Sequence, residues 1–147
     1  MIYAENKKAK HDFSFLKEYV AGIKLLGFEV KAVRVGKVNL KGSHVIVRGG
    51  EAFVVGMHIS PYQPKNTPED YDPERPRKLL LQKKEIEEIA EAEKQKGLTV
   101  VPVMLYNKGA FLKLKIATAK GKKKHDKREE IKKRDIEREL RRSLKNK

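Results

Sequence analysis

The sequence contains no cysteine among its 147 residues. A disulfide framework, a zinc site built on thiolates and a cysteine nucleophile are therefore excluded. Aromatic residues are also few, with five Phe and five Tyr, and they are not arranged as a row of stacking platforms. This scarcity disfavours binding of single-stranded nucleic acid by base stacking and favours recognition of RNA by shape and backbone.

Long apolar runs are missing as well. No stretch approaches the ~18 apolar residues that a membrane span needs, and the N-terminus has no apolar run of signal-peptide length. We therefore expect a soluble, cytoplasmic protein. Binding to an anionic membrane surface is disfavoured because the large apolar helix face that such binding needs is absent.

Motifs for catalysis and for metal binding are not found. The four histidines lack metal-ligand spacing: His11, His44, His58 and His125. Gly49-Gly50 lacks the Lys-Ser/Thr pair of a phosphate loop, and adjacent Glu87 and Glu88 are typical of a solvated helix face. We expect no metal, no cofactor and no enzymatic activity.

Positive charge is abundant. Lys and Arg number 35 against 20 Asp and Glu, a net charge of +15. Nearly half of this excess lies in residues 121–147, which hold 13 basic and 6 acidic residues. So basic a chain attracts polyanions, and nucleic acid is the first candidate.

The last 27 residues have too few large aliphatics to fold alone, so we divide the chain into a domain, 1–120, and a basic tail, 121–147.

The domain is predicted to be mainly β. Five segments predict strands: 28–35, 45–48, 52–55, 99–106 and 111–116. Gly49-Gly50 predicts a hairpin turn between the second and third of them, and Pro102 indicates an edge or bulge position in the fourth. Short strands with regular turns favour an antiparallel barrel that is closed or nearly closed.

Two helices are predicted within this β domain. Apolar residues at helical spacing predict the first, at Leu16, Tyr19, Val20 and Ile23. Gly27 is its expected stop. Residues 83–96 predict the second, with acids early, lysines late and Gly97 at its end. Residues 60–77, rich in Pro and Asp, predict a long exposed loop.

Three basic clusters are candidate RNA-binding sites. The first contains Lys7, Lys8, Lys10 and His11, and the second contains Arg75, Arg77 and Lys78. The third, residues 120–128, runs from the end of the domain into the tail. In a helical projection of the tail, one stripe is basic and free of acids: Lys127, Arg134, Arg138, Arg141 and Lys145. We expect a tail that becomes helical on RNA, and a disordered solubilising tail is the alternative.

An ordered set of motifs resembles the small protein B family, the SsrA (tmRNA)-binding proteins of bacterial trans-translation. The motifs are NKKAKHDF (6–13), AGIKL (21–25), EVK (29–31), GEAF (50–53), HISPY (58–62), DPERPRKLLL (72–81), KGLTVVP (96–102) and AKGKKKHDKRE (119–129). The resemblance implies an OB-fold-like antiparallel β-barrel with two to three embedded short helices. It also implies an adaptor that delivers tmRNA to stalled ribosomes without catalysis.

The same resemblance implies the partners and their contacts. The barrel binds the tRNA-like domain of tmRNA, the tail meets the decoding centre, mRNA channel and rRNA of the ribosome, and elongation factor Tu is reached indirectly through charged tmRNA. We expect a monomer in solution. With the basic clusters, the expected RNA contacts are Asn6, Lys7, Lys8, Lys10, His11, Gly22, Arg77, Lys78, Leu80, Gln82, Lys120, Lys122 and Lys123. The expected tail contacts are Lys124, His125, Asp126, Lys127, Arg128, Arg134, Arg138 and Arg141, with His125 stacking on a base.

Two positions depart from the family pattern. Val20 stands where the family usually has a Glu that is expected to contact tmRNA, and Gln82 stands where Asn or His is common. An amide at position 82 still forms hydrogen bonds. Because composition alone also suits a ribosomal structural protein or a general translation factor, that function is the alternative.

Overall fold

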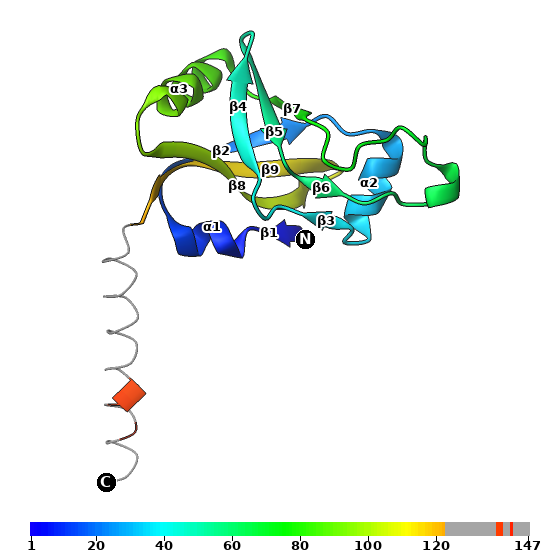
Figure 1. The fold of residues 1–147 in the computed structure, drawn as a ribbon, viewed down its shortest axis with the longest axis horizontal. Helices are drawn as coiled ribbons and strands as arrows, with labels where there is room; N and C mark the ends of the chain where they lie inside the picture. Colours follow the sequence, from blue (N-terminus) through cyan, green and yellow to red (C-terminus); the bar gives the residue numbers. More distant parts are fainter. Residues whose placement is uncertain (123–137, 140–141, 143–147) are drawn as a thin grey trace.

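A curled, antiparallel sheet of seven strands forms most of the fold (Figure 1). The computed structural model describes residues 1–122, 138, 139 and 142. The strand order is β1-β8-β9-β2-β7-β5-β4, and a second sheet pairs β3 with β6. The strands are β1 (Ile2–Glu5), β2 (Phe13–Ile23), β3 (Val38–Asn39), β4 (His44–Arg48), β5 (Glu51–Val55), β6 (His58–Ile59), β7 (Arg77–Leu80), β8 (Leu98–Lys108) and β9 (Phe111–Gly121). The mainly β prediction is confirmed.

The larger sheet has two free edges. Among residues 1–122, β1 and β4 are its outer strands and no ladder joins them. The sheet nevertheless folds back on itself, because β4 contacts β8 without pairing with it. The core lies inside this curl, with the side chains of Ala21, Leu79, Leu105 and Ile116 each no more than 1% exposed.

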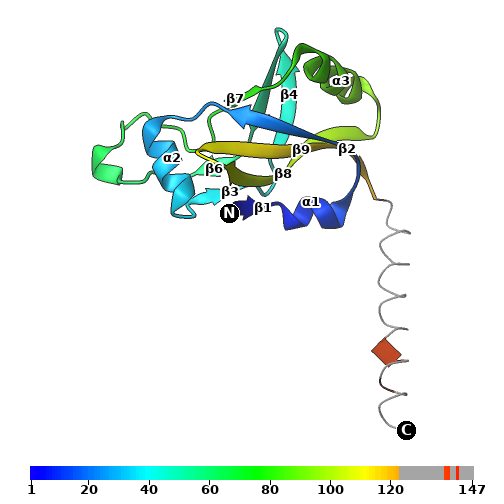
Figure 2. The same ribbon diagram turned by 180° about the vertical axis from the view of Figure 1, so that it is seen from behind.

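Three helices cover the edges and ends of the sheet. They are α1 (Lys7–Asp12), α2 (Gly27–Arg34) and α3 (Lys83–Lys94), and a 3-10 turn lies at η1 (Pro64–Asn66). Helix α3 packs on β4 and β8, and α1 lies against β2 and β8 on the other side of the sheet (Figures 1 and 2). None of the helices in the described part of the chain is long and apolar enough to cross a membrane.

The helix predicted at 16–23 is wrong, since these residues belong to β2. Tyr19 and Ala21 are buried while Leu16 and Val20 are 58% and 47% exposed, the alternation of a strand. The helical spacing of the apolar residues was a coincidence. Pairing of β2 with β9 along almost its full length decides the conformation instead.

The strand predicted at 28–35 is also wrong, because this segment forms α2. Glu29, Ala32 and Val33 are fully buried on one helical face. The side chain of Glu29 also caps the helix, accepting the Leu26 N–H at 2.8 Å. In a strand, the polar side chain of Glu29 would point outward to solvent. In α2 it instead faces the interior, where arginine side chains pair with it.

Other predictions are confirmed. The hairpin at Gly49-Gly50 joins β4 and β5, and both glycines have positive φ. The helix predicted at 83–96 is α3, which ends two residues earlier, at Lys94. Pro102 lies at a bulge in β8, where the register shifts before Met104. It is not at an edge, because β8 lies between β1 and β9.

The loop predicted at 60–77 is partly right. It contains η1, and its last residue, Arg77, is the first residue of β7 and is fully buried. The domain boundary was predicted near Gly121, the last residue of β9. The division into domain and tail stays a prediction.

A buried ion-pair cluster joins α2 to this loop and to β7. Arg77 donates to Glu29 Oε2 from Nη2 at 2.6 Å and from Nε at 2.8 Å, and both side chains are fully buried. Tyr71 donates to the same oxygen at 3.0 Å, and Arg75 pairs with Glu29 Oε1. Arg77 also donates to the carbonyl of Pro73 at 2.9 Å. The carboxylate and both guanidinium groups therefore have several partners, as buried charges require.

Replacing Arg77 with Ala removes one partner of the buried pair and leaves the Glu29 carboxylate underpaired. We expect the free energy of unfolding to fall by about 3–5 kcal/mol, measured by urea denaturation. Arg48→Ala is the control, because its pair with Glu93 is exposed and such pairs contribute about 0–1 kcal/mol. Equal losses for the two variants would contradict the structural role of Arg77.

Acid should destabilise the protein partly through Glu29. Burial acts to raise the pKa of this carboxyl, but hydrogen bonds from Arg75, Leu26 N–H and Arg77 outweigh it and hold the pKa below the ordinary 4.5. The resulting stabilisation is complete above about pH 4.5 and is lost as pH falls below it, through the folded-state pKa. Glu29→Gln should lower stability at pH 7 and flatten its decline between pH 5 and pH 3. Glu69→Gln, at an exposed carboxylate outside this cluster, is the matched control.

Candidate nucleic-acid interface

Helix α1 presents the first cluster of basic side chains. Lys7, Lys8, Lys10 and His11 are all exposed. His11 Nδ1 lies 3.0 Å from Asp12 Oδ1, the last residue of the helix. These side chains can reach the phosphates of an RNA, which fix register and orientation without reading sequence.

Asn6, also predicted to contact RNA, has a structural position instead. It is 4% exposed, its amide donates to the Pro102 carbonyl at 2.8 Å, and its Oδ1 accepts the Ala9 N–H at 3.2 Å. Asn6 therefore begins α1 and fixes it to the bulge of β8. We correct its role from contacting RNA to positioning the lysines that follow it.

The end of β9 brings further lysines to α1. Lys120 pairs with Ser14 of β2, next to the end of α1, and the Lys122 N–H donates to the Asp12 carbonyl at 2.9 Å. We call Lys7, Lys8, Lys10, His11, Lys120 and Lys122 the α1 patch. The sequence predicted all six, and the fold joins two segments more than 100 residues apart into one surface. Lys123 lies outside the described residues.

The remaining predicted contacts gather at the other end of β2. Gly22 is the ladder partner of Leu80, and Leu80 is 51% exposed. A Cβ added at Gly22 would lie 3.2 Å from the Leu80 Cβ, so glycine permits this close approach. Exposed Gln82 follows as the N-cap of α3, and Lys78 Nζ lies 2.9 Å from Glu51 Oε1. We call Val20, Gly22, Lys78, Leu80 and Gln82 the Leu80 patch.

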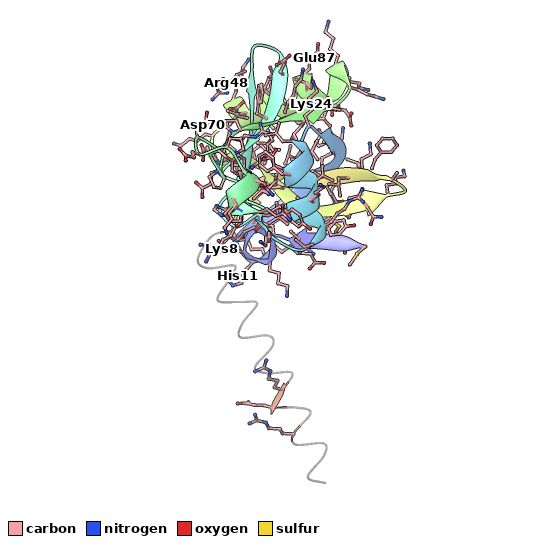
Figure 3. All side chains as sticks on the ribbon, turned by 90° about the vertical axis from the view of Figure 1, so that its right-hand side faces the viewer. Lys8, His11, Lys24, Arg48, Asp70 and Glu87 are labelled. Carbon is pink, nitrogen blue, oxygen red and sulfur yellow. The ribbon has the colours of Figure 1, made fainter. Side chains whose placement is uncertain are left out.

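The two patches lie at opposite ends of one long strand. At ~3.3 Å per residue, the nine steps from Phe13 to Gly22 along β2 correspond to about 30 Å. Figure 2 shows β2 running from the α1 end to β7, and Figure 3 shows Lys8 and His11 well separated from Lys24. An RNA that contacts both patches must therefore extend along the domain.

Arg77 is buried and belongs to neither patch. Its guanidinium is occupied by Glu29 and by the carbonyls of Met57 and Pro73. Arg75, beside it, is directed to Glu29 as well. The basic cluster at 75–78 therefore supplies only Lys78 and a partly exposed Arg75 to the surface, and we withdraw Arg77 from the expected RNA contacts.

Three lysines near the Leu80 patch were not predicted. Lys113 and Lys115 of β9 are the ladder partners of Gly22 and Val20. Lys24 follows β2, and its N–H donates to the Lys78 carbonyl at 2.9 Å. The alternation at 111–116 did indicate outward lysines, but only the strand order reveals their neighbours.

Most of the expected tail contacts lie outside the described residues. These are Lys124, His125, Asp126, Lys127, Arg128, Arg134 and Arg141. Arg138, which is described, is helical and exposed. In the described part of the chain, no three His, Asp or Glu side chains come close enough to hold a metal ion.

Comparison with known proteins identifies the family. The family model described as SmpB protein matches residues 3–146. An SsrA-binding protein of Oleidesulfovibrio alaskensis is 50% identical over 97% of this chain and 92% of its own length. One of Microcystis aeruginosa is 46% identical over 98% of this chain and 94% of its own length.

A solved structure is also similar. It is described as "tmRNA-SmpB: a journey to the center of the bacterial ribosome", and its matching chain is 42% identical with a TM-score of 0.68. The match covers 82% of this chain and 84% of the other. Since the family model spans nearly the whole sequence and these relatives cover it almost end to end, the chain belongs to the SmpB protein family.

Proposed function

We propose that this protein binds tmRNA (SsrA RNA) and delivers it to stalled ribosomes in trans-translation, acting as an adaptor rather than as an enzyme. The observation that carries the proposal is the family match over residues 3–146. The name of the relatives, SsrA-binding protein, supports the RNA partner, and the similar tmRNA-SmpB structure supports the ribosome. Such an adaptor acts in the cytoplasm, where it meets elongation factor Tu only through charged tmRNA.

The Leu80 patch suits contact with the tRNA-like domain of tmRNA. Leu80 and Val20 offer half-exposed apolar surface, and Gly22 lets the Leu80 side chain lie close against β2. Lys113 and Lys115 beside them supply positive charge for phosphates. Apolar contact and phosphate binding are thus combined on the neighbouring strands β7, β2 and β9, which suits recognition of RNA shape.

Val20 changes this patch relative to the family pattern. Its ladder partner is Lys115, so a Glu at position 20 would face a lysine across the strands. In this chain Lys115 Nζ lies 3.5 Å from Glu18 Oε2 instead. We infer that the patch binds RNA through a more apolar and less acidic surface than the family pattern implies.

The α1 patch extends the RNA contact along the domain, and the tail continues from it. We propose that residues 121–147 become helical in the vacant mRNA channel, with Lys124, His125, Asp126, Lys127 and Arg128 at the decoding centre. The density of basic residues in the tail and the helical conformation of Arg138 support this assignment. The curled sheet, with β4 against β8, likewise supports an OB-fold-like barrel.

Competition between RNAs tests the proposal. The purified protein should shift labelled tmRNA in a gel, and unlabelled tmRNA should displace it at least tenfold more effectively than bulk tRNA or rRNA. Shape and backbone contacts at two separated patches provide this preference. Equal displacement by all three RNAs would favour a ribosomal structural protein or a general translation factor.

Truncation of Leu80 tests the Leu80 patch. Leu80→Ala should weaken tmRNA binding about tenfold, because an exposed apolar anchor at an interface is lost. Val35→Ala is a matched control, since Val35 is an aliphatic residue 58% exposed at the end of α2, outside both patches. Equal dissociation constants for the two variants would place the RNA elsewhere on the domain.

A further inference from the structure

A cavity of about 230 Å³ lies beneath α1, bordered by β8 and by the turn that precedes β4. Its lining includes the apolar residues Ala9, Val101 and Phe13 and the basic residues Lys8 and His44. We propose that this cavity takes one unstacked nucleobase of the RNA that the α1 patch binds. The inference rests on the proposed function and adds a base-binding site to it.

The size and lining of the cavity suit a single base. Sites for drug-sized ligands have volumes of roughly 300–1,000 Å³, so a cavity of about 230 Å³ suits a smaller, flat ligand. Ala9 and Val101 belong to a small apolar cluster that also contains Ala119, against which Phe13 packs. A base that leaves its stack loses apolar and aromatic contacts, and this cluster replaces them.

The cavity is held in place by hydrogen bonds within the domain. Asn6 ties the start of α1 to Pro102, and the Lys122 N–H ties its end to Asp12. On the other wall, the Ser43 hydroxyl donates to the Leu40 carbonyl and fixes the turn before His44. A site formed before binding costs little ordering entropy, so a single base can contribute useful affinity.

Charge favours a nucleotide over an uncharged ligand. Lys8 lies at the border itself, and Lys7, Lys10 and Lys122 lie on the adjoining segments of the chain. A phosphate at these lysines would leave its base next to the opening. Asp12, also at the border, has His11 as a neighbour at 3.0 Å, which offsets its charge when the imidazole is protonated.

The base can come from tmRNA or from rRNA of the small ribosomal subunit, and both are RNA. Filling the cavity distinguishes these sources. Thr99 lines the cavity from β8, where large β-formers are tolerated, so Thr99→Phe would occupy the space with little change to the sheet. The full-length variant is tested for binding to tmRNA and to purified small subunits at several salt concentrations.

We expect Thr99→Phe to weaken binding to one of the two RNAs about tenfold, because stacking of one base is lost. The slope of log K against log salt should stay unchanged, because no phosphate contact is removed. Lys8→Ala should instead reduce this salt slope by about one, because one phosphate contact is removed. Thr67→Phe is the matched control, because it places the same change in a cavity beside α2.

The inference is overturned if Thr99→Phe binds both RNAs normally, if its weaker binding comes with a reduced salt slope, or if Thr67→Phe weakens binding equally. Should Thr99→Phe lose its cooperative thermal transition, the smaller Thr99→Leu replaces it, with an expected loss of about threefold. Failure of the unaltered protein to prefer tmRNA in the competition assay would instead overturn the proposed function. That assay uses no cavity variant, so the two failures are distinguishable.

Discussion

The ion pair between Glu29 and Arg77 is the interaction on which the domain most depends. Both charges are fully buried, so each is tolerable only because the other is present. The pair joins α2 to the first residue of β7, and Tyr71 and Pro73 bring the intervening loop to the same point. Because β7 lies between β2 and β5, the pair also fixes the strand that carries Leu80. A buried charge pair thus positions an exposed apolar contact three residues away.

The sequence predicted those elements whose signals are local. Turn glycines located the β4–β5 hairpin, and the charge order and Gly97 located α3. The predictions for 16–23 and 28–35 were exchanged, helix for strand, because their outcome depends on distant partners. Residues 16–23 form a strand because they pair with β9. Residues 28–35 form a helix that places Glu29 next to its buried partner, Arg77. Neither partner is visible from periodicity, which reports only how a segment distributes its own apolar residues.

For the candidate site, the sequence predicted most of the residues that belong to it but not how they are arranged in space. Charge and family motifs identified nearly every exposed residue of the two patches, but not that the patches lie about 30 Å apart along β2. Lys113 and Lys115 were missed because their relation to Gly22 and Val20 follows from strand register alone. Arg77 was included because a guanidinium in a basic cluster looks available, and only its burial shows otherwise.

Each patch follows the same design, in which a buried polar residue precedes the exposed contacts in the chain. Asn6 is 4% exposed and anchors α1 to β8, and the lysines directly after it face solvent. Arg77 is fully buried on Glu29, and Lys78 and Leu80 follow on the outer face of β7. A side chain can position an RNA only if the protein backbone that carries it is held in place. The buried anchoring residue and the exposed contact residues therefore belong in one short motif. Motif membership therefore predicts which segment meets RNA, while burial separates the residues proposed to touch the RNA from those that hold them in place.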